Sequence, residues 1–214
     1  VDADNCVSAL VGIDDLVTIP ETLDNPVVIM AGGLGTRLRP MTEDTPKPLL
    51  PVGGRPILET IIEQLTGYGL TRILLSVNYK SEMVRKHFGD GSNFGADIRY
   101  LEEEDSLGTA GPLGLIEDAG EAPVLVMNGD LLTKLNFKAL LSYHRELESE
   151  VTVCVREFDM QVPFGVIEQD NNRVRAIVEK PIHKFLVNAG IYVVEPNVVR
   201  EVPRGQRLDM PDLL

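Results

Sequence analysis

From residue 27 onward, short apolar segments alternate with segments whose apolar residues recur at the spacing of a helix. Strands are expected at 27–31, 72–78, 98–102, 124–127, 151–158 and 187–194, and helices at 56–67, 81–88, 110–118 and 137–148. The first strand is apolar throughout, as in a strand that is covered on both faces. This alternation is typical of a mainly parallel, mixed sheet with helices on both faces, so we predict a Rossmann-like α/β/α sandwich.

Two further local patterns lie late in the chain. In the helix expected at 137–148, the apolar spacing places His144 and Leu147 on the buried face. The segments 166–169 and 174–178 flank a polar turn around Asn171, which predicts a β-hairpin and hence a small antiparallel pair of strands.

The net charge restricts the partners of the chain. Its 214 residues are enough for one domain with a substantial core. A formal charge of -13 disfavours non-specific binding to nucleic acid or to an anionic membrane surface. We therefore expect no nucleic-acid or membrane partner, and phosphate groups can be bound only by a local cluster of basic residues.

The cysteines and the N-terminal segment bear on the compartment. Cys6 and Cys154 lie far apart in the sequence, a pattern more typical of two reduced thiols than of a disulfide or a metal site. The N-terminal segment has no pattern of a secretory signal, and no apolar run approaches the roughly 20 residues that span a bilayer. We expect a cytoplasmic protein.

The two ends of the chain differ from its middle. A short apolar and acidic stretch ends at Pro20, and Asn25-Pro26 breaks any regular structure after it. We expect residues 1–22 to be the tail of a preceding module with its linker, and residues 26–214 to form the main domain. Pro211 followed by apolar residues is typical of a helix start, so we expect this domain to be truncated at its C-terminus.

A glycine-rich, basic loop follows the first expected strand. In an open α/β sheet, ligands bind beyond the carboxyl ends of the strands. The glycines from Gly32 to Gly35 let the backbone approach phosphate oxygens and direct N–H groups at them. Arg37 can contact a phosphate with two hydrogen bonds, and Lys47 adds a point charge in the same loop. The loop predicts a phosphate-binding site, although glycines alone would also suit a tight turn.

Two better-known phosphate loops fit this segment less well. The dinucleotide fingerprint requires a third glycine where this chain has Leu38, and an acidic residue at the end of the second strand, where it has Asn78. The P-loop requires Gly-Lys-Ser/Thr, which the chain lacks. A dinucleotide-dependent oxidoreductase is therefore a weaker alternative.

Several motifs in order resemble those of the sugar-phosphate nucleotidylyltransferases. They are GGLGTRLRP (32–40), TPKPLLPV (45–52), LGTAGP (107–112), NGD (128–130), FGV (164–166), EKP (179–181) and NAG (188–190). The chain is most similar to the bacterial branch that includes mannose-1-phosphate and heptose-1-phosphate guanylyltransferases. In some of that branch the domain follows a pair of CBS modules, and residues 11–19 resemble the end of such a module.

The resemblance implies transfer of a nucleotidyl group from an NTP to a sugar 1-phosphate, with Mg²⁺ as cofactor. It implies catalytic roles for Arg37, Lys47 and Lys180; nucleotide contacts by Ala31, Gly32, Gly33, Gly35, Thr36, Gly108, Thr109, Asn128 and Gly129; and sugar contacts by Ala110, Gly165, Glu179 and Asn188. GTP is the preferred nucleotide, while UTP, CTP and dTTP stay open, as do mannose, heptose, glucosamine and glucose as the sugar. A non-catalytic, nucleotide-sugar-binding homologue is the second alternative, and a homo-oligomer is left open.

Asp130 is the expected metal ligand. It ends a buried strand at the ligand-binding edge, where a carboxylate suits Mg²⁺ but can also cap a turn. In the family, the matching Asp binds the metal together with a second Asp in a Trp-x-Asp-x-Gly-like motif. This chain has no Trp, and the second ligand is missing from it, which puts its activity on its own in doubt.

Overall fold

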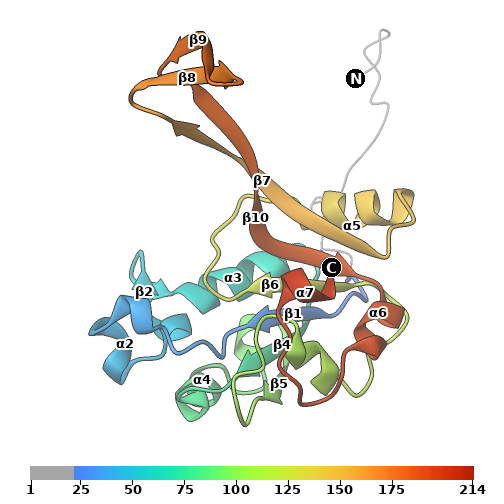
Figure 1. Cartoon of the computed structure of the whole chain (residues 1–214). Coiled ribbons are helices and arrows are strands. Elements are labelled where there is room, and N and C mark those ends of the chain that lie inside the picture. Colours follow the sequence, from blue (N-terminus) through green and yellow to red (C-terminus); the bar gives the residue numbers. More distant parts are fainter. Residues whose placement is uncertain (1–21) are drawn as a thin grey trace, which may run out of the picture.

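A six-stranded sheet in the order β5-β4-β1-β6-β10-β7 forms the centre of the computed structural model, which describes residues 22–214 (Figure 1). Its strands are β1 (Val27–Met30), β4 (Arg72–Val77), β5 (Asp97–Glu102), β6 (Val124–Asn128), β7 (Val151–Gln161) and β10 (Ile182–Val194). The first four run parallel, whereas β10 is antiparallel to both β6 and β7. The predicted mainly parallel, mixed sheet is confirmed.

Helices cover both faces of the sheet, because the strands bury side chains on alternate sides. Val27 and Ile29 of β1 pack against the helices on one face of the sheet, and Val28 packs against the helices on the other face. The first face carries α3 (Ile57–Gly67), α4 (Ser81–Phe88) and α5 (Phe137–Glu146), and the second carries the 3-10 helix η4 (Gly111–Leu115), α6 (Pro196–Glu201) and α7 (Met210–Leu213). The central strand is thus buried on both sides, as its uniform apolar sequence predicts.

Helix α3 illustrates how local sequence builds this layer. It begins directly after Pro56, whose fixed φ suits a helix start. Leu58, Ile61 and Leu65 recur at helical spacing and are at most 1% exposed. Gly69, with a φ of 85°, then turns the chain toward β4 in a conformation that favours glycine.

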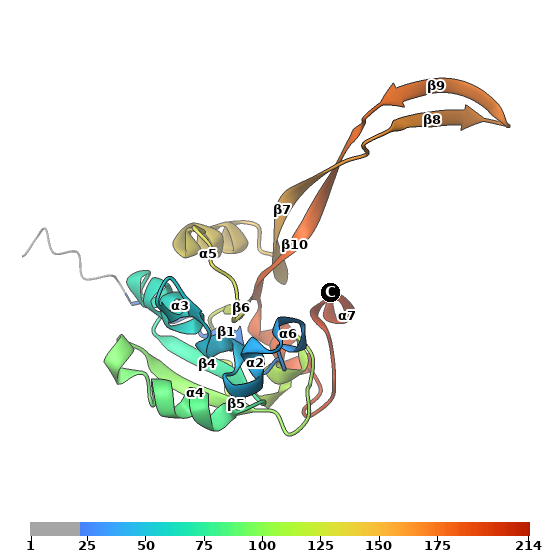
Figure 2. The same ribbon diagram turned by 90° about the vertical axis from the view of Figure 1, so that its left-hand side faces the viewer.

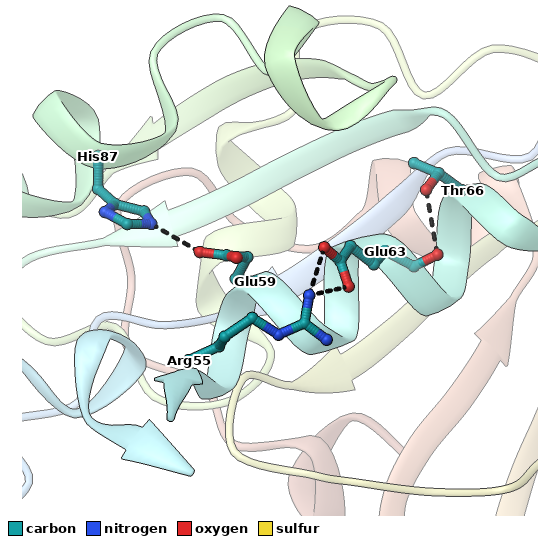
Figure 3. A network of polar contacts seen from close by, with 5 residues as sticks. All are labelled: Arg55, Glu59, Glu63, Thr66 and His87. Atoms are coloured by element: carbon teal, nitrogen blue, oxygen red, sulfur yellow. Dashed lines mark hydrogen bonds and ion pairs between the residues drawn. The ribbon is translucent and has the colours of Figure 1, made fainter. Parts of the chain in front are cut away.

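The opposite side of α3 carries polar contacts (Figure 3). Arg55 donates two hydrogen bonds to the carboxylate of Glu63, at 2.8 and 2.7 Å. Glu59 faces Nε2 of His87 on α4 at 3.1 Å, and Thr66 donates to the backbone oxygen of Glu63 at 3.1 Å. This network lies on the solvent side of α3, away from the sheet.

Strands β7 and β10 continue beyond the sheet as a two-stranded arm, with the hairpin of β8 (Gly165–Asp170) and β9 (Arg173–Glu179) at its far end (Figures 1 and 2). The hairpin at Asn171 is confirmed, and the residue has a φ of 46°. The arm carries the exposed apolar side chains of Val155, Phe158, Met160, Phe164, Ile167, Val174, Ile177, Ile182, Phe185 and Leu186. β7 and β10 are longer than predicted, because the arm continues the ladder past the core.

The short elements near the site complete the fold. They are η1 (Thr36–Leu38), α2 (Met41–Asp44), η2 (Lys47–Leu49), β2 (Pro51–Val52), β3 (Arg55–Pro56) and η3 (Ser92–Phe94). The segment expected as a helix at 110–118 forms only η4. The helix expected at 137–148 ends at Glu146, so Leu147 is 55% exposed, whereas His144 is fully buried as predicted.

Within residues 22–214, the helices are all too short or too polar to cross a membrane. The expected tail of a preceding module, residues 1–22, lies almost wholly outside the described residues.

Candidate active site

The carboxyl ends of the parallel strands meet at one edge of the sheet, beside β1. β1 pairs with β4 on one side and with β6 on the other, so the chain leaves β1 at the point where the strand order reverses. A cavity of about 340 Å³ lies there. The predicted residues that line it are Ala31, Gly32, Gly33, Arg37, Lys47, Gly108, Thr109, Asn128, Gly129 and Asp130. An open α/β sheet binds ligands at such a reversal.

The glycine-rich loop forms one wall of this cavity. No partner for the backbone N–H of Gly32, Gly33 or Gly35 lies among residues 22–214. A Cβ added at Gly33 would meet no atom within 4 Å, so the backbone at Gly33 faces open space. Unpaired N–H groups in succession form a site for an anion.

Gly35 has a different role from Gly33. Its φ is 62°, its carbonyl accepts a hydrogen bond from the hydroxyl of Thr42 at 2.9 Å, and a Cβ would lie 2.8 Å from Cγ2 of Thr42. Gly35 therefore fixes the turn of the loop. Neither Gly35 nor Thr36 lines the cavity.

Lys47 and Asp130 form an ion pair across the cavity. Lys47 begins η2 and Asp130 follows β6, so elements 83 residues apart are joined here. The two side chains are only 30% and 35% exposed. Arg37, in η1, is exposed at the rim. Arg37, Lys47 and Asp130 thus place charges of both signs around the cavity in front of the glycine loop.

A neighbouring hollow extends the site from β6 toward β10. Asn188 lines it together with Thr109, Asn128 and Asp130. A bulge between Asn188 and Tyr192 brings the chain close to β6, and a Cβ at Gly190 would lie 2.5 Å from the amide nitrogen of Asn128. The hollow is therefore placed to receive a second ligand group beside Asp130.

The loop at Gly108 is held by the C-terminal segment. Gly108 has a φ of 82°, and a Cβ would lie 2.6 Å from the backbone oxygen of Leu208. The backbone N–H of Thr109 donates to Asp209 at 3.0 Å. Ala110, expected to touch the sugar, is fully buried in the core and lines neither hollow.

Three expected site residues lie on the arm instead. Lys180 has its backbone N–H bonded to the oxygen of Phe164, and Glu179 lies against Gly165. Lys180 and Asn188 are eight positions apart along a mostly extended chain, which corresponds to roughly 26 Å. The structure therefore does not bring Gly165, Glu179 and Lys180 together with the Lys47–Asp130 pair.

Sequence reasoning missed the acidic residue at the other end of the cavity. Glu103 directly follows β5, is 9% exposed and lines the cavity beside Gly32. Its carboxylate accepts hydrogen bonds from the hydroxyl of Ser76 and, at 2.7 Å, from the backbone N–H of Leu107. Its position at a strand end was the available signal, but within a run of three glutamates it resembles a solvated surface residue.

Asp130 fits a hard cation that shares its ligands with a substrate. Mg²⁺ in phosphate-transfer sites often takes one or two carboxylates and completes its shell with phosphate oxygens and water. Among residues 22–214, no cluster of three or more potential metal ligands forms. Asp130 therefore suits a metal that arrives with a phosphate, not a metal held by the protein alone.

A second cavity, of about 500 Å³, lies against β4 and β5. It is lined by residues such as Arg72, Tyr100 and Ile116, and it contains neither the glycine loop nor Asp130. Burial raises the pKa of the Tyr100 hydroxyl, so this side chain stays neutral. Arg72, Arg99 and Arg204 also line this cavity, but of the two cavities only the smaller one contains the glycine loop and the Lys47–Asp130 pair.

Comparison with known proteins identifies the family to which this chain is similar. The model of the nucleotidyl transferase family matches residues 26–209. The mannose-1-phosphate guanylyltransferase of Mycobacterium tuberculosis is 36% identical over 191 residues, which are 86% of this chain and 52% of that protein. The mannose-1-phosphate guanyltransferase of Pichia angusta is 40% identical over 182 residues, or 80% and 50%. The chain spans about half the length of the curated relatives that it matches.

Two solved structures are also similar to this chain over most of its length. HddC from Yersinia pseudotuberculosis, complexed with GMP-PN, matches with a TM-score of 0.65 and 29% identity, over 86% of this chain and 82% of that one. A putative glucose-1-phosphate thymidylyltransferase from Bacillus anthracis matches with a TM-score of 0.69 and 27% identity, over 88% and 80%.

Proposed function

This chain belongs to the nucleotidyl transferase family, and from that premise we propose that it transfers a guanylyl group from GTP to a sugar 1-phosphate, giving a GDP-sugar and pyrophosphate. The observation that carries the proposal is the cavity that joins the glycine loop to the Lys47–Asp130 pair at the reversal of strand order. The names of the relatives favour GTP and mannose 1-phosphate. We expect the reaction in the cytoplasm, and a homo-oligomer stays open.

The reaction needs no general base. An oxygen of the sugar phosphate, already an anion at neutral pH, attacks the α-phosphorus of GTP and forms the new P–O bond. The bond from the α-phosphorus to the bridging oxygen breaks, and its electron pair leaves with pyrophosphate. The protein has to hold two anions in line and offset their charge.

The residues of the cavity divide this task by position. The unpaired N–H groups at Gly32 and Gly33, with Arg37 at the rim, would bind the triphosphate and the leaving pyrophosphate. Lys47 would offset the charge at the α-phosphate. Asn188, in the adjoining hollow, would bind sugar hydroxyls. The intact set Arg37, Lys47 and Asp130 supports an enzyme, and within residues 22–214 nothing favours the non-catalytic alternative.

Mg²⁺ is the expected cofactor, and Asp130 would be its protein ligand. When bound, the ion would polarise the phosphoryl oxygens and neutralise charge on the triphosphate. Lys47, now paired with Asp130, would then be released to contact a phosphate oxygen.

A contact of Lys180 with the sugar phosphate, or of Glu179 with the sugar hydroxyls, requires the arm to fold toward the cavity. The bulge at Asn188–Tyr192, with Gly190 at a φ of 71°, gives the arm a bend at its base. If the arm closes, Lys180→Ala should lower turnover far more than stability. A loss of folding equal to the loss of turnover would count against this role.

The direct test is an assay of pyrophosphate release with this chain, Mg²⁺, each of four NTPs and each of four sugar 1-phosphates. The proposal predicts release with GTP and mannose 1-phosphate, and a large loss in Arg37→Ala with unfolding unchanged. Turnover with a different NTP, and none with GTP, would support the transfer reaction but show that the nucleotide base is not guanine. Absence of turnover with every pair, in a chain that is folded and also in one extended to the length of its relatives, would refute the proposal.

A further inference from the structure

The two-stranded arm exposes far more apolar surface than the transfer reaction explains. Residues 22–214 expose twenty large apolar side chains, and eleven of them lie between Val155 and Leu186, although that range holds only 32 of these 193 residues. The arm projects away from the sheet and its helices (Figure 2), so the core does not cover these side chains. Monomeric soluble proteins rarely expose apolar patches of this extent. Such a surface calls for a partner that covers it.

The stem of the arm, residues 155–161 of β7 and 182–188 of β10, carries an aromatic patch on one face. Phe158 and Phe185 are directly opposite in the strand register, so their side chains lie on the same face. Met160, two residues after Phe158, lies on that face as well. The three side chains are 44%, 47% and 46% exposed. These cross-strand neighbours form one patch that a single partner surface can cover.

The hairpin at the far end of the arm has opposite charges on its two strands. β8 carries Glu168 and Asp170, and β9 carries Arg173 and Arg175, all of them exposed. The two strands form a sheet of their own, and a sheet of two strands is marginally stable by itself. A second hairpin stacked on the first, with each β8 over the other's β9, brings opposite charges together at both strands. The hairpin is therefore complementary in charge to a copy of itself.

The arm as a whole carries no net charge, whereas the rest of the chain is strongly acidic. Five of the 20 Lys and Arg residues and five of the 33 Asp and Glu residues lie between Val155 and Asn188, so the formal charge of -13 belongs to the rest of the chain. Two acidic bodies repel each other. The arm is thus a part of the surface at which two copies can approach without net repulsion.

We propose that the arm is the interface of a homodimer, in which the arms of two copies stack face to face about a two-fold axis. The aromatic patch of each copy covers that of the other, and each β8 lies over the β9 of the other copy. A two-fold contact uses the same surface on both copies, which a self-complementary hairpin allows. A second copy fits better than an unrelated protein, because its arm supplies both the apolar face and the matching charges.

Sedimentation velocity of the chain between about 1 and 100 µM tests this interface, and the unaltered chain should sediment as a dimer. Phe158→Ser with Phe185→Ser should raise the dissociation constant about 100-fold or more, because each dimer loses four covered rings. Tyr143→Ser with Leu147→Ser is the matched control, since both side chains are 55% exposed but lie in α5 and directly after it. The control should leave the dimer unchanged, and urea unfolding checks that each variant is folded.

The charges of the hairpin give a second test that leaves the apolar face intact. Arg173→Glu with Arg175→Glu makes both strands acidic and should weaken the dimer about 10-fold or more. Addition of Glu168→Lys and Asp170→Lys to this variant restores opposite charges on β8 and β9. The fourfold exchange should therefore return the dissociation constant to within about threefold of its original value.

Each result decides for or against the arm. A monomer throughout the concentration range overturns the inference, and so does a dimer that survives the substitution of Phe158 and Phe185. Equal weakening by the control at Tyr143 and Leu147 also overturns it, as does a fourfold exchange that does not restore the dimer. The measured quantity is the mass of the particle, so the outcome is independent of whether the chain transfers a nucleotidyl group.

Discussion

Replacement of Lys47 by Met should separate catalysis from stability. The Lys47–Asp130 side chains are 30% and 35% exposed, and pairs with this access to water contribute about 0–1 kcal/mol to folding. At the α-phosphate, the same ammonium group would act on charge that develops during transfer, where one such contact contributes about 3–4 kcal/mol. Lys47→Met should therefore lower kcat by about 10²- to 10³-fold and the free energy of unfolding by about 1 kcal/mol or less.

The assay pairs initial rates of pyrophosphate release with urea unfolding of the same samples. Arg55→Met is the matched control, because it also breaks an ion pair of a basic residue, with Glu63 at 2.7 Å, on the outer side of α3 (Figure 3). The control should change neither quantity appreciably. Equal rate losses in the two variants would refute the role of Lys47, and so would a loss of more than about 3 kcal/mol of stability in Lys47→Met.

Three further predictions concern His144, Gly108 and Cys154. His144→Ala should lower the free energy of unfolding, measured in urea, by about 2–4 kcal/mol. The substitution opens a cavity and removes the partner of Glu195, whose carboxylate lies 3.1 Å from Nε2 of His144. A change below about 1 kcal/mol would contradict the packing. Gly108→Ala should weaken GTP binding at least 10-fold in calorimetry, because its φ of 82° and a backbone oxygen 2.6 Å from the new Cβ force the loop to move; unchanged affinity would show that the loop does not contact the nucleotide. Burial raises the pKa of the Cys154 thiol. In a Cys6→Ser background, Cys154 should therefore react more slowly with a disulfide reagent than free cysteine does at neutral pH, and its reaction should accelerate as the pH rises. Equal rates at neutral pH would contradict its burial.

The sheet and the glycine loop could be predicted because local sequence determines them. Val27–Met30 is apolar on both sides of the strand, and this pattern is typical of a strand covered on both faces. The run from Gly32 to Lys47 begins where that strand ends, and the ligand-binding edge of an α/β sheet follows from topology alone. For the same reason Asp130, at the end of β6, could be placed at this edge from the sequence, whereas its ion pair with Lys47 was not predicted.

The arm and Glu103 could not be predicted, because they depend on which segments meet in space. The apolar residues at 151–158 and 187–194 indicate strands, but not that these strands continue past the core and leave Lys180 far from Asp130. Glu103 is buried only because Gly32 and Ser76, from two other strand ends, close over it. Burial of an acidic residue by distant neighbours leaves no periodic signal in the sequence.

A crystal structure of the chain with a non-hydrolysable GTP analogue and Mg²⁺ tests the central claim most directly. The account predicts the triphosphate along Gly32 and Gly33, with Arg37 and Lys47 on its oxygens. Density for the analogue in the cavity lined by Arg72 and Tyr100, with the glycine loop empty, would contradict it.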